Sequence, residues 1–316
     1  DLLRRLRREA PVLVVLEGTG IAGGVAMLLA DALLGVPYVV STGDAVGPYL
    51  AKRHAALGVA GSLYERLLLR RAAGVIGWTP YLAGRALTFG TPRTVTAPGW
   101  ARAVPAPGAR TRSRARLGIP PDALVFGLVG SLAWRASVGY TYGLELVRAL
   151  RRTDRPDLRI CIVGDGSGRE QLEREAGEDL GRRVLLPGRV PAEEVADMLA
   201  AFDVASLPQS TDAVGSFRYT TKLPEYLAAG LPVVTGQIPA AYDLDDGWLW
   251  RLPGEAPWDD AYLDALAVLM RDLRPPELAE RTAAARERAP FFGREAQQAR
   301  VAAFIADVIA RETSGT

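Results

Sequence analysis

The stretch "TTKLPEYLAAGLPVVTG", residues 220–236, combines a helix signal with a strand signal. Apolar residues recur at helical spacing from Leu223 to Leu227, and Pro224 is tolerated there only because it falls in a first turn. Gly230 ends the helix, and "PVVTG" follows as a short β-branched strand. The stretch therefore predicts a helix that leads directly into a strand, which is the repeating unit of a parallel α/β sheet.

Strand signals of the same kind recur on both sides of this stretch. In the second half they are "LVFGLVG", "RICIVG", "RVLLPG", "VASLP" and "PVVTG", with "WLWRL" as a weaker sixth. Helical patterns separate them, and the first half repeats the theme with "PVLVVLEG", "VPYVVSTG", "GVIGWT" and "RTVTA". Alternation of strands and helices predicts parallel strands joined by right-handed crossovers. We expect an α/β protein with two Rossmann-like, doubly wound domains that face each other across a cleft, with binding at the carboxyl ends of the strands.

The length of 316 residues suggests two domains, at about 150 residues per domain. We expect an N-terminal domain over residues 1–110, which includes a linker at 97–121 that is rich in proline, glycine and arginine. A second domain then spans residues 122–290. The last segment, 291–316, has the pattern of one amphipathic helix that can cross back to the first domain.

The charge of the chain is divided unevenly between its halves. Residues 1–121 hold 16 Lys and Arg against 6 Asp and Glu, whereas residues 122–316 hold 22 against 30. A basic first half suits an anionic acceptor or peripheral contact with a membrane surface, and nucleic acid is not expected as a partner. The alternative explanation of this charge division is that the charged residues lie on ordinary solvent-exposed helix faces. The single cysteine, Cys161, excludes a disulfide within the chain and favours a cytoplasmic location, including the inner membrane face.

Several kinds of site are disfavoured. His54 is the only histidine and lies among basic residues, which leaves hydrolytic triads without another source of imidazole. No P-loop and no Cys/His metal spacing occurs, and the "DLDD" run at residues 243–246 is interpreted as a solvated turn. The glycines of "VGDGSGRE", residues 163–170, predict a tight turn between strand and helix rather than a dinucleotide fingerprint. We therefore expect neither a metal site nor a bound cofactor.

Lys222 stands out because it lies at the expected start of a helix. Of the 38 basic residues only Lys52 and Lys222 are lysines, and a cation is mildly unfavourable at the positive end of a helix. Thr220 and Thr221 are expected to cap this helix. A local pair between Lys222 and Glu225 is one explanation. The other is that helix N–H groups and an ammonium together bind an anion such as phosphate.

Four motifs in a fixed order carry a family resemblance. They are the V-G-D-G turn, the G-R-V-P loop, the A-F-D-V strand and K-L-P-E-Y-L-A-A-G-L-P-V-V, spread over residues 159–236. In this order they resemble the C-terminal domain of GT-B glycosyltransferases of family 4. "VPYVVSTGD" and "RAAGVIGWTPYL" are similar to later strands of the family's N-terminal domain, so the resemblance covers nearly the whole chain.

The resemblance implies a metal-independent enzyme that moves a sugar from a nucleotide diphosphate-sugar to an acceptor hydroxyl with retention of configuration, and with no cofactor besides its substrate. Lys222 would meet the diphosphate, and Glu225 would bind the ribose. The residues expected to bind the donor are Gly130, Ser131, Arg189, Val190, Thr220, Thr221, Lys222, Leu223 and Glu225. The residues expected to act in catalysis are Lys222, Arg135 and Asp44, and those expected to contact the sugar or acceptor are Glu17, Asp44 and Ser216.

The chain departs from the family pattern at three places. Phe217 stands where the family has a glutamate that touches the donor sugar, while Ser131 and Tyr142 stand where it has cations, with Arg135 as the nearest replacement. The first βα units of the N-terminal domain are not recognised, so that domain is expected to be incomplete. Asp44 can equally be a turn residue, and Glu17 likewise. The missing cations at Ser131 and Tyr142 and the absent first part of the N-terminal domain favour the alternative function, a non-catalytic nucleotide-sugar-binding or partner subunit with the same fold.

Overall fold

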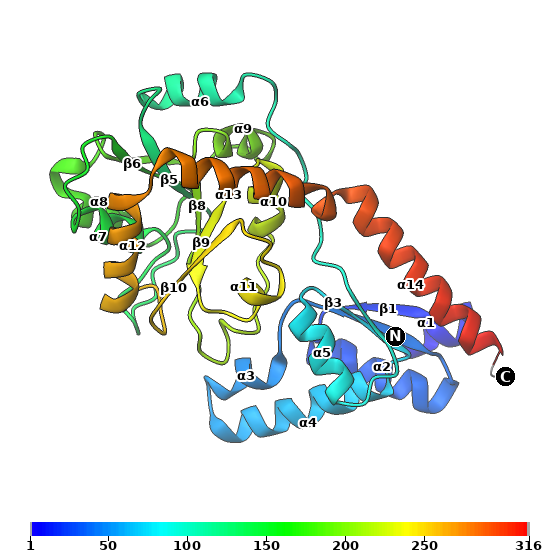
Figure 1. The fold of residues 1–316 in the computed structure, drawn as a ribbon. Helices are drawn as coiled ribbons and strands as arrows, with labels where there is room; N and C mark the ends of the chain where they lie inside the picture. Colours follow the sequence, from blue (N-terminus) through cyan, green and yellow to red (C-terminus); the bar gives the residue numbers. More distant parts are fainter. Residues whose placement is uncertain (1, 315–316) are drawn as a thin grey trace. The chain divides into compact units, whose positions relative to one another are not determined.

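The computed structural model describes residues 2–314, which form two compact units. The first unit contains residues 2–99, 213–220 and 294–314, and the second contains residues 100–212 and 221–293. Each unit is built on one parallel sheet with helices around it (Figure 1). This confirms the α/β class and the two Rossmann-like units predicted from the alternation of strands and helices.

The first unit has four parallel strands in chain order. They are β1 (Val14–Glu17), β2 (Tyr38–Thr42), β3 (Gly74–Gly77) and β4 (Thr94–Thr96), in the order β1-β2-β3-β4. The helices between and before them are α1 (Leu2–Glu9), α2 (Ile21–Leu34), α3 (Val46–Ala51), α4 (Ala55–Arg71) and α5 (Pro80–Thr88). Because the strand order never reverses, right-handed crossovers put α2, α4 and α5 on one face of the sheet. Met27, Tyr38 and Leu68 are buried in the core between that face and the helices.

The other face of this sheet is covered by the last helix, α14 (Arg294–Ser314), drawn in red in Figure 1. Val308 is fully buried against the sheet, and the ring of Phe304 packs on Gly74, where any side chain would lie 2.7 Å from that ring. The helix starts later than the sequence suggests, because a 3-10 turn, η3 (Ala289–Phe292), precedes it. Neither α14 nor any other described helix is both long and apolar enough to span a membrane.

The second unit has six parallel strands whose order reverses in the middle. They are β5 (Leu124–Val129), β6 (Leu158–Val163), β7 (Val184–Gly188), β8 (Val204–Leu207), β9 (Val233–Gly236) and β10 (Leu249–Leu252), in the order β10-β9-β8-β5-β6-β7. The sheet is flanked by α6 (Ala109–Leu117), α7 (Leu144–Leu150), α8 (Arg169–Ala176), α9 (Val195–Leu199), α10 (Lys222–Ala228), α11 (Ala240–Asp243), α12 (Asp260–Asp272) and α13 (Pro275–Arg288), with 3-10 turns η1 (Gly177–Asp179) and η2 (Ala192–Glu194).

The reversal lies between β5 and β8, which are paired with each other. From β5 the chain proceeds one way through α7 to β6, and from β8 it proceeds the other way through α10 to β9. The neighbouring loops therefore diverge at the carboxyl ends of β5 and β8, which is where open α/β sheets bind ligands. Cys161, in the middle of β6, is fully buried, as its apolar surroundings in the sequence predict.

The boundaries of the units differ from those expected. The first unit ends at residue 99 rather than 110, and the expected linker at 97–121 contains α6, which belongs to the second unit. The reason is Arg114, which is almost fully buried and forms an ion pair of 2.8 Å with Asp203 just before β8. Residues 213–220 also change unit, since they pack on the first unit although they follow β8. No pattern in the sequence indicates that this segment belongs to the first unit.

Candidate functional site

A cleft of about 690 Å³ opens at the carboxyl ends of β5 and β6 in the second unit. It is lined by Val129, Gly130, Ser131, Val163, Gly164, Asp165, Gly166, Arg189, Val190 and Val195. Four of the predicted donor-binding residues, namely Gly130, Ser131, Arg189 and Val190, are thus brought together from two loops that are far apart in the sequence. The cleft lies beside the reversal of strand order, where the fold predicts a ligand.

The glycine turn after β6 forms one wall of this cleft. Gly164 and Gly166 have φ angles of +145° and +157°, values that a residue with a side chain rarely adopts. A Cβ at Gly164 would collide with the carbonyl oxygen of Gly130, and one at Gly166 would lie 2.7 Å from the backbone of Leu132. The turn is therefore tight, as predicted. Its glycines also let two backbones touch, and they leave this wall of the cleft without side chains at positions 164 and 166.

Lys222, the first residue of α10, packs against the end of β5. A Cβ built on Gly130 would lie 2.7 Å from its Cε and 3.0 Å from its Nζ, so a side chain at position 130 would displace the end of the lysine from its present place. Thr221 does not cap the helix, contrary to expectation, because it has αR backbone angles and its side chain makes no capping hydrogen bond. Thr220 lies outside the second unit. The lysine thus stands beside the cleft at the start of a helix without a side-chain cap.

Tyr142 brings Arg135 and Lys222 to one place. Lys222 Nζ lies 5.2 Å from the centre of the Tyr142 ring, and the guanidinium of Arg135 also lies 5.2 Å from it. An Arg135 nitrogen donates a hydrogen bond of 3.2 Å to the Tyr142 hydroxyl. Both distances lie within the range of cation–π attraction. The sequence suggested only that a cation is lost at position 142. In the structure the tyrosine lies against the two cations that remain.

A buried carboxylate, Glu145, supports the loop that carries Arg135 and Tyr142. It accepts hydrogen bonds from the Tyr140 hydroxyl (2.7 Å), the Gly143 amide (2.9 Å) and the Ser206 hydroxyl (3.0 Å). Burial raises the pKa of Glu145, while these hydrogen bonds oppose the rise. Sequence reasoning missed this residue. The available signal was a glutamate inside the otherwise apolar helix start "GLELV", which is unusual for a buried position.

Glu225 lies one turn along α10 from Lys222 and is half-buried. Burial raises the pKa of its carboxyl group, and the positive charges of Lys222 and Arg102 lower it by a smaller amount. The local pair with Lys222 considered from the sequence is therefore present as a charge interaction. Leu223, between them, is buried with only 3% of its surface exposed, so only its backbone is available to a ligand.

Glu17 and Asp44 lie in the first unit, at the ends of neighbouring strands. Glu17 is the last residue of β1 and pairs in register with Ser41 of β2, and its side chain is exposed. Asp44 follows β2 in a turn in which its amide donates a 3.3 Å hydrogen bond to the Thr42 hydroxyl. Its carboxylate lies 3.6 Å from Arg218. The structure thus gives Asp44 the features of a turn residue, with an exposed carboxylate that pairs with Arg218.

The segment 213–220 packs on this same unit and contains the predicted contact residue Ser216. Phe217 stacks on Tyr81 with 5.2 Å between ring centres, and the guanidinium of Arg85 lies 4.7 Å from the centre of the Phe217 ring. The Tyr219 amide donates a 2.8 Å hydrogen bond to the Gly43 carbonyl. Position 217, where the family has a sugar-binding carboxylate, therefore serves to attach the segment.

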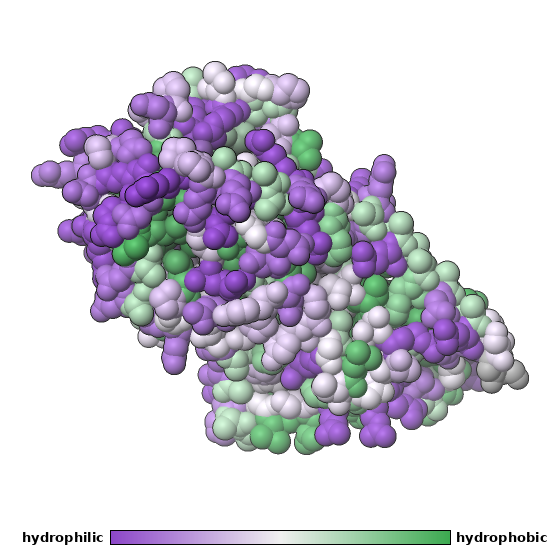
Figure 2. Space-filling view, in the orientation of Figure 1, coloured by the Kyte–Doolittle hydropathy of each residue, from purple (hydrophilic) through white to green (hydrophobic). Residues whose placement is uncertain are grey.

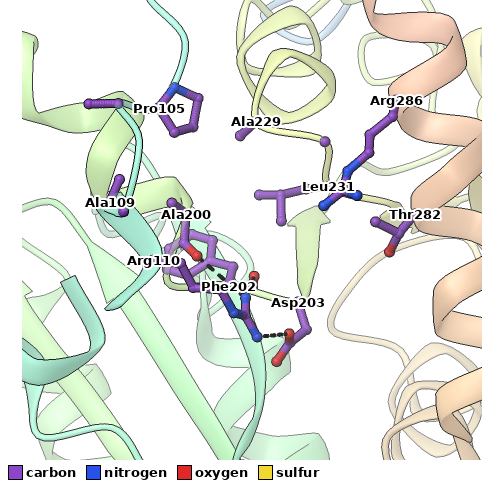
Figure 3. A pocket seen from close by; sticks show the side chains of 13 residues that line it. Pro105, Ala109, Arg110, Ala200, Phe202, Asp203, Ala229, Leu231, Thr282 and Arg286 are labelled. Carbon is purple, nitrogen blue, oxygen red and sulfur yellow. Dashed lines mark hydrogen bonds and ion pairs between the residues drawn. The ribbon is translucent and has the colours of Figure 1, made fainter. Parts of the chain in front are cut away.

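A second pocket, of about 390 Å³, lies at the opposite end of the second unit's sheet (Figure 3). Arg110 and Asp203 lie on one side of it, whereas Leu231, Thr282 and Arg286 lie on the other (Figure 3). Arg110 donates to Asp203 at 2.6 Å and to the Phe202 carbonyl at 2.9 Å. Its charge is already matched by a carboxylate, which makes this pocket the weaker candidate for an anion.

Within residues 2–314, no group of three or more His, Cys, Asp or Glu side chains is arranged to hold a metal ion. The acidic run at 243–246 is engaged in ion pairs. Asp245 lies 2.6 Å from Arg251, and Asp246 lies 2.9 Å from Arg288. These pairs explain the acidic run as a local structural feature of the second unit.

Two protein families match this chain, one over part of each unit. Residues 123–272 match the family described as glycosyl transferases group 1, and residues 1–100 match the glycosyl transferase 4-like domain. A D-inositol 3-phosphate glycosyltransferase of Stackebrandtia nassauensis is 31% identical over 186 residues, which cover 55% of this chain and 41% of that protein. The chain thus spans less than half the length of this curated relative.

Solved structures share the fold at low sequence identity. Anabaena Alr3699/HepE in complex with UDP superposes with a TM-score of 0.73 at 18% identity, over 97% of this chain and 82% of that one. Sucrose-phosphate synthase from Thermosynechococcus elongatus gives a TM-score of 0.74 at 18% identity, over 98% and 77% of the two chains. Likeness at this level of identity shows the fold alone.

Proposed function

Because this chain belongs to the GT-B glycosyltransferases, we propose that it transfers a sugar from a nucleoside diphosphate-sugar donor to a hydroxyl group of an acceptor. The observation that carries the proposal is the position of Lys222. It stands at the start of α10, packed against Gly130 at the edge of the glycine-lined cleft. A lysine placed there, with Arg135 against the same Tyr142 ring, suits a diphosphate.

Each part of the donor is assigned a place in the second unit. The diphosphate is proposed to lie over Gly130 and Ser131 next to Lys222, where small residues allow close approach. The ribose is proposed to bind Glu225, and the base to lie by the backbone of Arg189 and Val190. The structures of HepE with UDP and with UDP-glucose support a donor of this class.

The proposed chemistry is retaining and needs no metal ion or cofactor besides the donor. The bond between the sugar and the diphosphate breaks, and the departing phosphate oxygen takes the proton from the acceptor hydroxyl as the new glycosidic bond forms. Lys222 and Arg135 would stabilise the negative charge that grows on the leaving group, which is where preorganised cations contribute most to rate. Asp44, Glu17 and Ser216 of the first unit are proposed as contacts for the donor sugar or the acceptor.

A thermal-shift series with UDP, GDP and ADP tests the donor site. A nucleotide at 100 times its dissociation constant adds about 2.7 kcal/mol to the free energy of unfolding, which raises the melting temperature measurably. We expect one of the three diphosphates to raise it and the matching nucleoside to raise it far less. If none of the three diphosphates changes the melting temperature, the assignment of the cleft to a nucleotide donor is wrong.

The stacking of Phe217 favours one alternative, a subunit that binds a nucleotide sugar without turning it over, because a carboxylate is replaced at that position. Release of the diphosphate from UDP-glucose, followed by chromatography in the presence and absence of acceptors, separates the two functions. Slow donor hydrolysis supports the transferase. Tight binding without any release of diphosphate supports the binding subunit.

A further inference from the structure

The helix α2 is apolar on its solvent side as well as on its core side. Ile21, Val25, Leu29 and Leu33 follow one another at intervals of four residues and remain 52%, 42%, 44% and 68% exposed. The core-facing positions, among them Met27 and Ala30, are fully buried. A helix that is apolar all round is normally covered on all sides. Its outer row therefore indicates a surface that another body covers.

The neighbouring helix α4 carries a second exposed apolar row of the same kind. Val59, Leu63 and Leu67 repeat the four-residue interval and are 63%, 65% and 51% exposed. The two helices are held tightly together, because Gly24 of α2 lies directly against Tyr64 of α4, with no room for a side chain. In Figure 2 hydrophobic residues gather along the lower edge of the molecule, where Figure 1 places α4. We refer to the seven exposed residues on both helices as the α2–α4 face.

The charges around the α2–α4 face are of one sign. Arg53, Arg66 and Arg70 are exposed there. The three acidic residues in the stretch 18–71 all have arginine partners: Asp31 lies 2.9 Å from Arg71, Glu65 lies 3.1 Å from Arg85, and Asp44 lies 3.6 Å from Arg218. Glu65 is also buried. The apolar rows are therefore bordered by arginines, whereas the nearby carboxylates are neutralised.

We propose that the α2–α4 face docks on an anionic lipid bilayer. Exposed aliphatic rows beside arginines match a surface that is apolar just below a negatively charged layer of headgroups. A second copy of this chain would bring the same arginines together, and like charges oppose such a dimer. In this docking the leucines insert into the acyl-chain region, and the arginines form ion pairs with the phosphates of the headgroups. The proposal concerns a surface of the first unit and does not depend on the donor site.

Flotation with lipid vesicles tests this proposal. The full chain is mixed with vesicles of pure phosphatidylcholine or of phosphatidylcholine with phosphatidylglycerol, without nucleotide, at low and high salt. We expect it to float with the anionic vesicles only, and less at high salt. The double variant Arg66→Glu/Arg70→Glu should weaken binding by more than tenfold, since each basic residue near such a surface contributes about fivefold. Leu63→Ser/Leu67→Ser should weaken binding at every salt concentration.

Matched variants outside the α2–α4 face control for changes in net charge or hydrophobicity that are not specific to this face. Arg174→Glu/Arg182→Glu changes the net charge equally on the second unit, and Leu87→Ser/Val268→Ser removes exposed aliphatic residues outside the face. Neither should change flotation. Circular dichroism and melting curves must show that each variant is folded, and sedimentation velocity reports the oligomeric state. Equal binding to neutral and anionic vesicles, no binding at all, or a dimer abolished by Leu63→Ser/Leu67→Ser would each overturn the proposal. Loss of nucleotide binding would leave it intact.

Discussion

The two ends of the second unit's sheet use their cations in different ways. At the amino end, Arg110 and Arg114 share the carboxylate of Asp203, with distances of 2.6 Å and 2.8 Å. At the carboxyl end, Arg135 and Lys222 lie against the ring of Tyr142, which carries no net charge. Basic side chains thus form ion pairs with a protein carboxylate at the amino end, whereas at the carboxyl end they make cation–π contacts with an aromatic ring.

This difference indicates that the cations at the amino end contribute to the stability of the fold, whereas those at the carboxyl end are available for ligand binding. A cation that is already paired with a buried carboxylate contributes to folding and has little left for a ligand. A cation that lies against an uncharged ring is not neutralised by that ring. Glu225 adds a carboxylate near Lys222, but burial raises its pKa, so this group is less ready to be charged than an exposed glutamate. We expect substitutions at the two ends to affect different measurements, in the following order of size.

The largest effect is expected for Arg114→Ala. Arg114 also donates to the carbonyls of Ala201, Pro121 and Ala123, so its removal leaves Asp203 with Arg110 as its remaining arginine and takes a donor from several buried carbonyls. Urea unfolding should show a loss of about 3–5 kcal/mol, typical of a buried ion pair that loses one member. The control is Arg112→Ala on the same helix, whose pair with Asp197 is exposed and should cost less than about 1 kcal/mol. Similar losses for both variants would contradict the assignment of the amino end to stability.

Lys222→Ala should come next and should act on binding. Loss of a charged hydrogen bond to phosphate costs about 2–3 kcal/mol in affinity. Calorimetry with the nucleoside diphosphate that raises the melting temperature most, and with its nucleoside, measures this loss. The diphosphate should lose affinity and the nucleoside should not. Lys52→Ala, at the chain's other lysine, is the matched control and should bind both as before. Equal weakening for diphosphate and nucleoside would return Lys222 to a purely local role.

Glu225→Ala should reduce affinity by roughly 1.5 kcal/mol for a nucleotide with both ribose hydroxyls, and by less for its dideoxy analogue. The pKa of Glu225 is raised by burial, so it takes up a proton at a higher pH than an ordinary glutamate. The protonated form is the poorer acceptor for ribose hydroxyls. Affinity should therefore fall as the pH is lowered through that raised pKa, and the Ala variant should lose this dependence. A wild-type affinity that is independent of pH would argue against contact with the ribose.

The smallest effect is expected at Tyr142. Tyr142→Phe keeps the ring and removes only the exposed hydrogen bond from Arg135, so diphosphate affinity should change little. Tyr142→Ala removes the ring from both cations and should cost about 0.5–1 kcal/mol, the usual size of an exposed cation–π contact. If the Phe variant loses as much as the Ala variant, the hydroxyl and not the ring positions Arg135 and Lys222.

The sequence predicted the elements of regular structure well, because strand alternation and glycine or proline punctuation are local signals. All ten strands within residues 2–314 were identified from such patterns. The donor cleft was also predictable in part, since Gly130, Arg189 and Val190 belong to motifs with fixed places in the fold. These residues meet because parallel strands place their carboxyl ends together.

Other parts of the site depend on contacts between distant segments and left no local pattern. In the sequence, Tyr142 stands where the family pattern has a cation. Only the structure shows that its ring lies near both Arg135 and Lys222. The segment 213–220 follows a strand of the second unit yet packs on the first through Phe217. Thr221 was a reasonable cap by residue type, but its backbone angles prevent that role. Each case is decided by tertiary packing rather than by spacing along the chain.

The position of α14 has a consequence for how the protein is made. Val308 and Phe304, close to the end of the described chain, help complete the core of the unit whose sheet begins at Val14. A ribosome releases the sheet of this unit long before it releases the helix that covers one of its faces. The second unit has all its described residues, 100–212 and 221–293, available earlier. The unit that is synthesised first is thus completed last, and until then one face of its sheet lacks the helix that covers it in the folded protein.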